Sequence, residues 1–397
     1  MKTFLQPLQN LAEMEEIQKQ AKKNRGILEI SGCMESQKAH LMYGLSGLFP
    51  CHLVIAADEK SAKELYEDYR FYDKRVYYYP AKDLLFFQAD IHGNLLIRQR
   101  MQVIRALLER EDEITVVTSN DGCMDYLVPL EKIEKQLIHF RNDSTLDMDK
   151  LTAALVHMGY ERVGQVEMPG QFSIRGGIID IYSLTEENPW RIELWGDEID
   201  SIRSFDAQSQ RSLENLDDVT IYPAAEQPME KNGVSFLDYF KETETLFFLD
   251  ELNHLEENAK AVQEEFQQSC ENRKEKGEIS LSGDWMCTWE ELCHKINDRN
   301  CVAMSLLDPK KSNWKISGQF NITVKSMSSY QSSFELLVKD LKQYKKEGYQ
   351  IVLLSGSRTR AERLAKDLQE EGLNAFYGQD SDRILQPGEI MVAYGHA

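Results

Sequence analysis

Short apolar runs alternate with amphipathic stretches over the first third of the chain. The apolar runs predict strands at 26–31, 52–57, 75–79 and 114–118, and the amphipathic stretches predict helices at 38–48, 61–71 and about 95–110. Ser61, followed by Glu64, predicts a capping box where the second of these helices begins. Strands and helices that alternate at this spacing predict a mostly parallel sheet with helices on both faces.

The pattern changes after about Asn120. It predicts strands at 170–182, 190–195 and 198–205, turns at Asn188-Pro189 and Gly196-Asp197, and a short helix at 151–158. Short strands joined by such turns indicate a small antiparallel α+β unit. The run LFFLD at 246–250 then returns to the buried, parallel type of strand and precedes a charged helix at about 255–276. We therefore expect the small unit to be inserted into the first sheet.

A third unit is expected near the end of the chain. Residues 308–318 are mostly polar and predict a linker, after which helices at 334–346 and 358–371 and strands at 350–355 and 389–393 form another α/β pattern. Because the sequence stops at Ala397 directly after the last strand, we expect it to be part of a longer protein. The expected division is 1–120 and 206–312 for the two parts of the first unit, 121–205 for the inserted unit and 313–397 for the third unit.

Composition narrows the classes of partner. Lys and Arg number 46 against 66 Asp and Glu, which gives the 397-residue chain a formal net charge of −20. Such a surface repels nucleic-acid phosphates on average, so protein or small-molecule partners fit better than DNA. The seven cysteines are scattered and odd in number, and Cys287, Cys293 and His294 lack the spacing of a zinc site. We expect a cytoplasmic protein without a membrane anchor.

A strand-to-helix junction at Gly32 has the position of a phosphate-binding loop. Gly32 and Lys38 keep the spacing of the glycine and lysine in GxxxxGK[ST]. Gln37, however, replaces the second glycine, and Ala39 lacks the hydroxyl that would hold magnesium. We favour a loop that keeps the fold and has lost the nucleotide.

The strand LFFLDE has the form of a Walker B strand. In an active site its Asp250 would hold magnesium and its Glu251 would orient water. Without a phosphate-binding loop, no magnesium-nucleotide would be bound beside these carboxylates. We therefore interpret them as a degenerate motif.

Charged side chains follow the strands of the inserted unit. Alternation places Arg191, Glu193 and Trp195 on one face of a strand, and Arg203 follows on the next strand. A charged face with an aromatic side chain suits a polar protein interface. The alternative is a solvated sheet face, and the pattern alone does not decide between the two.

Three stretches carry a resemblance to a known family. They read GQFSIRGGIIDIY at 170–182, GDEIDSIRSFDAQSQRSL from Gly196, and YPAKD at 79–83 with Arg98, Gln99 and Arg100 after it. Together they resemble the segment shared by the bacterial excision-repair protein UvrB and the transcription-repair coupling factors (Mfd). The resemblance covers essentially the whole chain.

The positions at which this sequence differs from UvrB favour the coupling factors as the nearer family. UvrB resembles a functional helicase with an intact phosphate loop and a β-hairpin that clamps DNA, whereas here the loop is broken and the segment after Asp83 is short and helix-like. The resemblance implies an α/β fold: a parallel-sheet RecA/UvrB-like domain split by an inserted small α+β domain and followed by a second small α/β domain.

The resemblance also implies a role. The family's full-length protein displaces RNA polymerase stalled at a lesion with an ATP- and Mg²⁺-dependent DNA translocase, and it recruits UvrA through the UvrB-like domain. The polymerase-binding and translocase motifs do not occur in these residues, so we expect a non-catalytic recruitment module without a cofactor. By motif match, the surface that the family uses for UvrA includes Arg175, Arg191, Glu193 and Arg203. In the intact protein this surface is expected to contact the C-terminal domain.

Two other functions compete with this hypothesis. A residual P-loop NTPase or helicase of the UvrB type would bind nucleotide through Lys38, and Gln37 and Ala39 argue against it. A small-ligand α/β binding protein would need an intact glycine-rich fingerprint, which the sequence lacks.

Overall fold

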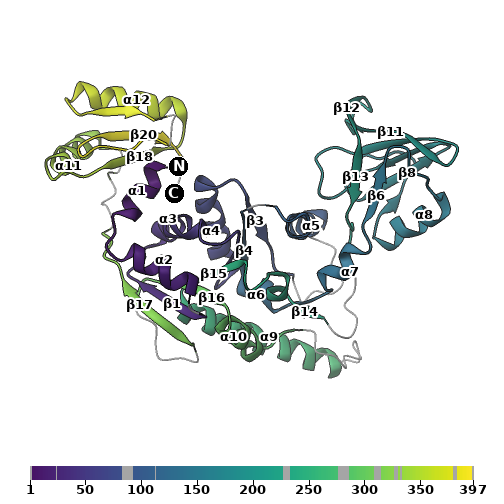
Figure 1. Cartoon of the computed structure of the whole chain (residues 1–397), viewed down its shortest axis with the longest axis horizontal. Coiled ribbons are helices and arrows are strands. Elements are labelled where there is room, and N and C mark those ends of the chain that lie inside the picture. Colours follow the sequence, from purple (N-terminus) through teal and green to yellow (C-terminus); the bar gives the residue numbers. More distant parts are fainter. Residues whose placement is uncertain are drawn as a thin grey trace.

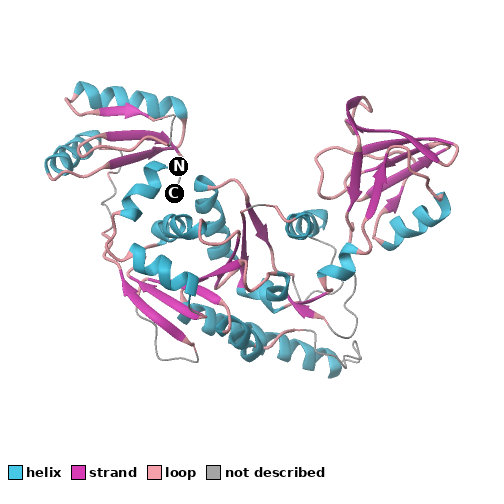
Figure 2. Cartoon of the chain, viewed as in Figure 1, coloured by secondary structure: helices cyan, strands magenta, loops and turns pink. Residues whose placement is uncertain are grey.

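The computed structural model describes residues 2–23, 25–82, 93–111, 113–226, 233–275, 286–307, 314–325, 330, 333–378 and 382–395. These residues form a central body with a smaller unit on either side (Figure 1). Figure 2 shows that one flanking unit is mostly strands, while the other two units combine strands and helices. The segment after Asp83, where the sequence suggested helix-like residues, lies outside the described residues, as do residues 308–313 of the expected linker.

The central body is built on a seven-stranded sheet in which every pair of neighbouring strands is parallel. Its strand order is β17-β1-β16-β15-β2-β4-β3. The strands are β1 (Gly26–Ser31), β2 (Cys51–Ala56), β3 (Val76–Tyr79), β4 (Ile114–Ser119), β15 (Thr245–Asp250), β16 (Asn300–Ser305) and β17 (Ile316–Asn321). All residues of β1, β4 and β15 are buried, as expected for parallel strands covered on both faces.

Two separate apolar clusters cover the two faces of this sheet. One face packs against α1 (Lys2–Gln9), α2 (Met14–Lys23), α3 (Glu35–Ser46) and α4 (Glu59–Tyr72). The other packs against α5 (Gly93–Glu109), α6 (Asn120–Met124), α9 (Leu252–Glu275), α10 (Trp289–Asn297) and the 3-10 helix η2 (Phe236–Tyr239). The mixed α/β architecture with a parallel sheet, predicted from the sequence, is thus confirmed.

Two local predictions in this body are wrong. The cap of α4 is Asp58, whose side chain accepts a hydrogen bond from the Ser61 amide at 2.8 Å, so the helix begins before Ser61. Residues 316–318, expected in a linker, belong to β17, which pairs with β1 at the edge of the sheet. A polar edge strand has little of the apolar pattern by which strands are recognised.

A six-stranded sheet lies in sequence between β4 and β15, in the order β12-β11-β10-β9-β8-β7. Its strands are β7 (Glu161–Arg162), β8 (Gln171–Arg175), β9 (Ile178–Ile181), β10 (Trp190–Trp195), β11 (Glu198–Phe205) and β12 (Ser212–Leu216). One face carries α8 (Met148–His157) and a core of its own that includes Phe140, Leu155 and Ile192. The pair β6 (Ile138–Arg141) and β13 (Asp218–Ile221) adds to this core. Residues 138–226 are called the six-stranded unit below.

The six-stranded unit connects to the central body through short elements. These are β5 (Tyr126–Leu127), α7 (Leu130–Glu134) and β14 (Val234–Ser235). The sheet runs past residue 205, where the sequence analysis placed the end of the inserted unit, because β12 pairs with β11.

The last unit is a three-stranded parallel sheet in the order β18-β20-β19. It comprises β18 (Ile351–Ser355), β19 (Ala375–Tyr377), β20 (Ile390–Tyr394), α11 (Phe334–Lys346) and α12 (Arg358–Glu370). The two helices share one apolar cluster with the sheet. A second cluster joins the sheet to Phe4 of α1, so the beginning and the end of the chain pack together.

Candidate functional site

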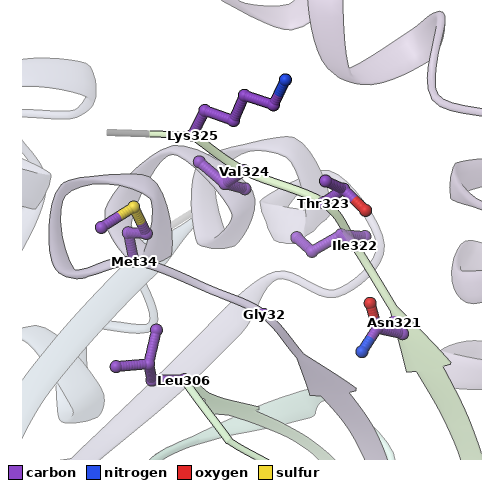
Figure 3. Close-up of a pocket in the computed structure, with 8 residues that line it drawn as sticks. All are labelled: Gly32, Met34, Leu306, Asn321, Ile322, Thr323, Val324 and Lys325. Atoms are coloured by element: carbon purple, nitrogen blue, oxygen red, sulfur yellow. The ribbon is translucent and has the colours of Figure 1, made fainter. Parts of the chain in front are cut away.

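The loop after β1 is closed by neighbouring strands. The amides of Gly32 and Cys33 donate to the carbonyls of Leu306 (3.3 Å) and Ser305 (3.1 Å), at the end of β16. Gly32 has φ +81°, and a Cβ placed there would lie 2.1 Å from the carbonyl oxygen of Ile322. The segment after β17 therefore passes directly against the loop (Figure 3). Two amides at the start of the expected phosphate cradle are used within the fold.

Lys38 is held by the two carboxylates of the degenerate Walker B strand. Its Nζ lies 2.6 Å from Asp250 Oδ1 and 2.7 Å from Glu251 Oε1, and its side chain is 5% exposed. Burial raises the pKa of Asp250, and the Lys38 ammonium opposes that rise. Glu251 Oε1 also accepts a hydrogen bond from the Leu306 amide at 2.9 Å. The structure thus brings together Lys38, Asp250 and Glu251, which the sequence placed in two separate motifs.

The other two residues of the loop motif are Gln37 and Ala39. Ala39 is fully buried in the apolar cluster beneath α3, and the buried Oε1 of Gln37 has no hydrogen-bond partner among the described residues. Among the described residues that line the hollow beside Gly32, one is charged, Lys325, and its ammonium points away from Gly32 (Figure 3).

Two arginines of the six-stranded unit converge on one buried carboxylate. Arg191 donates to both oxygens of Asp180, at 2.7 and 2.9 Å, and Arg175 donates to Asp180 Oδ2 at 2.8 Å. The Arg191 side chain is only 14% exposed and lies over the ring of Phe205, whereas that of Arg175 is 50% exposed. Arg191 is therefore largely occupied within the sheet, and Arg175 presents half of its surface to solvent.

Glu193 and Arg203 form a second ion pair on the same face. Arg203 lies opposite Arg191 in the register of β10 and β11, and it reaches diagonally to Glu193. Ser201 also donates to Glu193, at 3.4 Å. Diagonal pairs of opposite charge are an ordinary means of stabilising a sheet face. The structure brings all four sequence-predicted residues onto adjoining strands, in two ion-paired groups.

Trp195 is a highly exposed aromatic residue on this sheet and could contact a protein partner. Its side chain is 83% exposed at the end of β10, next to the turn at Gly196. The turn between β8 and β9 lies at the same end of the sheet, because β9 pairs antiparallel with both β8 and β10. Arg175 and Trp195 therefore project from one end of the sheet. Alternation had placed Trp195 beside Arg191 and Glu193, but it was not among the residues assigned to the site.

Sequence reasoning also missed two supporting residues. Asp180 joins the two arginines, and Gln210 accepts a hydrogen bond from Arg191 at 3.1 Å. Asp180 occurs within an otherwise apolar strand, which is the signal that could have identified it as the partner of a buried cation.

The described residues give no sign of a metal site or a membrane span. Within them, no group of three or more His, Cys, Asp or Glu side chains is placed to hold a metal ion. No helix in the described ranges has both the length and the apolar character needed to cross a bilayer.

Both the six-stranded unit and the chain as a whole are similar to known proteins. Residues 138–226 match the UvrB interaction domain. The chain is 28% identical over 441 aligned positions to the transcription-repair-coupling factor of Bacillus subtilis, which covers 92% of this chain and 37% of that protein. For Staphylococcus haemolyticus the identity is 25% over 377 positions, covering 81% of this chain and 32% of the relative.

A shorter stretch is more similar. Over 164 positions, or 41% of this chain and 14% of the relative, the identity to the Staphylococcus aureus (strain MRSA252) coupling factor is 35%. This chain covers 37% or less of the length of each of these three relatives. The matches confirm the resemblance seen in the sequence: along most of its length, the chain is similar to the N-terminal region of bacterial transcription-repair-coupling factors.

Proposed function

We propose that this chain is the recruitment module of a transcription-repair-coupling factor and that its six-stranded unit, as an inserted domain, binds UvrA. The observation that carries the proposal is the end of the sheet at Arg175 and Trp195. An arginine held by Asp180 and an exposed tryptophan lie at that end, within the residues that match the UvrB interaction domain. Arg and Trp are the residue types that most often dominate binding energy at protein interfaces.

The individual residues have different roles in this proposal. Arg175 and Trp195 contact UvrA directly, because their side chains are open to solvent. Arg191 fixes Asp180 and through it Arg175, while Glu193 and Arg203 hold the adjoining face in place. Arg191 is thus a positioning residue for the surface.

The rest of the proposal follows from the family. In the cytoplasm of a bacterium, the complete protein would displace stalled RNA polymerase by ATP-driven movement along duplex DNA, using parts outside these residues. The residues described here would bring UvrA to that site for excision repair. A residual NTPase is disfavoured by the engaged amides of the loop and by the two carboxylates on Lys38.

Calorimetric titration of purified UvrA tests the proposal. Arg175→Ala and Trp195→Ala are each expected to weaken binding by about 2 kcal/mol, or about 30-fold in Kd. The matched control is Lys150→Ala, which removes an exposed cation from α8 on the opposite face of the sheet. Arg191→Ala is expected to lower the melting temperature as well as the affinity, because Asp180 loses its main partner.

Two outcomes would contradict the proposal. Unchanged UvrA affinity in both surface variants, with native circular dichroism, would exclude this end of the sheet as the contact. Heat of ATP·Mg²⁺ binding that disappears in a Lys38→Ala variant with native circular dichroism would favour the NTPase alternative.

A further inference from the structure

The six-stranded unit is connected to the central body by two adjacent chain crossings. One follows α7 and enters β6, and the other leaves β13 and reaches Glu226. Because β6 and β13 pair antiparallel, with Ile138 opposite Ile221, the two crossings lie side by side. Two neighbouring chain segments at one edge of a unit form the geometry of a hinge.

Helix α5 is the element of the central body that faces this unit (Figure 1). Its apolar contribution is Ile97, which packs against the cores of both the central body and the six-stranded unit. Among the described residues, the ion pairs and hydrogen bonds that α5 side chains form with this unit fall into two groups, whose arginines differ in burial. An interface in which charged contacts are this prominent is typical of bodies that move relative to each other.

The inner group is centred on Arg100, whose side chain is fully buried. Arg100 forms an ion pair with Glu226, donates to the carbonyl oxygen of Pro80 at 2.8 Å, and lies over the ring of Tyr79, 4.2 Å from its centroid. Lys82 also contacts Glu226. Burial protects these charges from dissolved salt, so this group holds the end of the six-stranded unit firmly.

The outer group lies on the next turns of α5. Arg105 forms an ion pair with Glu186 and donates to Glu109 at 2.9 Å, and the Tyr222 hydroxyl donates to the same Glu109 oxygen at 3.1 Å. The Arg105 side chain is 33% exposed and that of Glu186 is 24% exposed. Pairs with this much exposure are worth about 1 kcal/mol or less and weaken as salt is added.

We propose that the six-stranded unit is a hinged body. Glu226, held by Arg100, is its pivot, and the partly exposed ion pair between Arg105 and Glu186 is a releasable latch. When the latch opens, the unit rotates about the paired crossings while Glu226 stays in place. This inference concerns the orientation of the unit and does not depend on the identity of its partner.

The hinge controls where the proposed binding end points. Glu186 lies in the connection between β9 and β10, at the end of the sheet opposite the turns beside Arg175 and Trp195. A rotation that frees Glu186 therefore swings the far end of the sheet through the largest arc. The latch thereby sets the direction in which that end faces the rest of the protein.

Distance distributions between two labels test the hinge. Labels are placed through non-natural amino acids at Lys60 on α4 and Lys150 on α8, both 85% exposed, and measured by single-molecule energy transfer. At about 0.1 M salt, where the Debye length is about 10 Å, the wild-type chain is expected to give one narrow distribution. Arg105→Ala is expected to broaden it or add a second distance.

Salt provides a test that needs no variant. At about 1 M salt, where the Debye length is about 3 Å, the wild-type distribution is expected to broaden in the same way. The matched control is Arg75→Ala, which removes an ion pair with Glu113 within the central body, where the two side chains are 48% and 59% exposed, and should leave the distribution narrow. Arg105→Lys should keep most of the narrow population. A distribution that stays narrow both in folded Arg105→Ala and at high salt would overturn the proposal.

Discussion

Arg191 and Arg175 lie on one sheet but differ in how much of each side chain is available to a partner. Both arginines contact Asp180, but Arg191 is mostly buried and Arg175 is half exposed. The sequence placed Arg175 on a candidate binding surface by motif match, and Arg191 also by alternation, which reports the face of the sheet that a side chain occupies. It does not report how much of that side chain is already occupied by a buried neighbour. That information required the contact with Asp180 of β9, the strand that lies between β8, which carries Arg175, and β10, which carries Arg191.

Asp121 is an ionisable residue whose burial affects stability. Burial raises the pKa of Asp121 to about 6, and the nearby carboxylates of Glu59 and Asp125 act in the same direction. Since the unfolded chain has the ordinary, lower value, the folded state binds the proton more tightly. Stability is therefore lost as pH rises from about 4 through about 6. Asp121→Asn is expected to stabilise the protein by about 1 kcal/mol at pH 8, with the gain vanishing near pH 4.

Urea unfolding at several pH values measures this effect. The control is Asp149→Asn, which changes an exposed acid in the first turn of α8. A gain for Asp121→Asn that is the same at pH 4 and pH 8 would show that charge burial is not its cause.

At the scale of elements, Lys38 connects α3 to the end of β15. Replacing a buried cation that serves two carboxylates leaves both of them without their partner, which typically costs about 3–5 kcal/mol. Lys38→Met is therefore expected to lower the free energy of unfolding by about that amount at pH 7, measured by urea denaturation. Lys325→Met, which removes the exposed cation beside the same hollow, should have little effect. Equal stability of the two variants would contradict this account of the loop.

The elements that sequence predicted well are those with strong local patterns. The predicted strands at 26–31 and 114–118 match β1 and β4 within one residue, because strands buried on both faces are continuous apolar runs. β17 was missed because an edge strand with Ser317 and Gly318 has no such run. The contact of Lys38 with Asp250 joins positions 212 residues apart, so no local pattern could predict it.

At the scale of the whole molecule, the six-stranded unit has the features of an autonomous domain. It has its own apolar core, and its ends, at Ile138 and Ile221, are paired in adjacent strands. We expect the isolated segment 138–226 to fold, because few apolar contacts to α5 are lost when it is excised.

Thermal denaturation followed by circular dichroism tests this expectation. The isolated segment should melt cooperatively, and a Phe140→Ala variant, which opens its core, should melt at a lower temperature. A non-cooperative transition in the unaltered segment would mean that its core depends on the central body.

The position of β1 in the large sheet has a consequence for biosynthesis. Its two neighbours are β16 and β17, so the backbone hydrogen bonds of β1 within the sheet cannot form until the ribosome has made residues from Asn300 onward. At translation rates of about 5–20 residues per second, that interval is about 15–55 s. During this time β2, β3 and β4 can already assemble, since they follow one another closely along the chain. A nascent chain on the ribosome therefore carries an apolar strand without neighbours until β16 has been made, and this strand is where a chaperone that binds apolar segments would act.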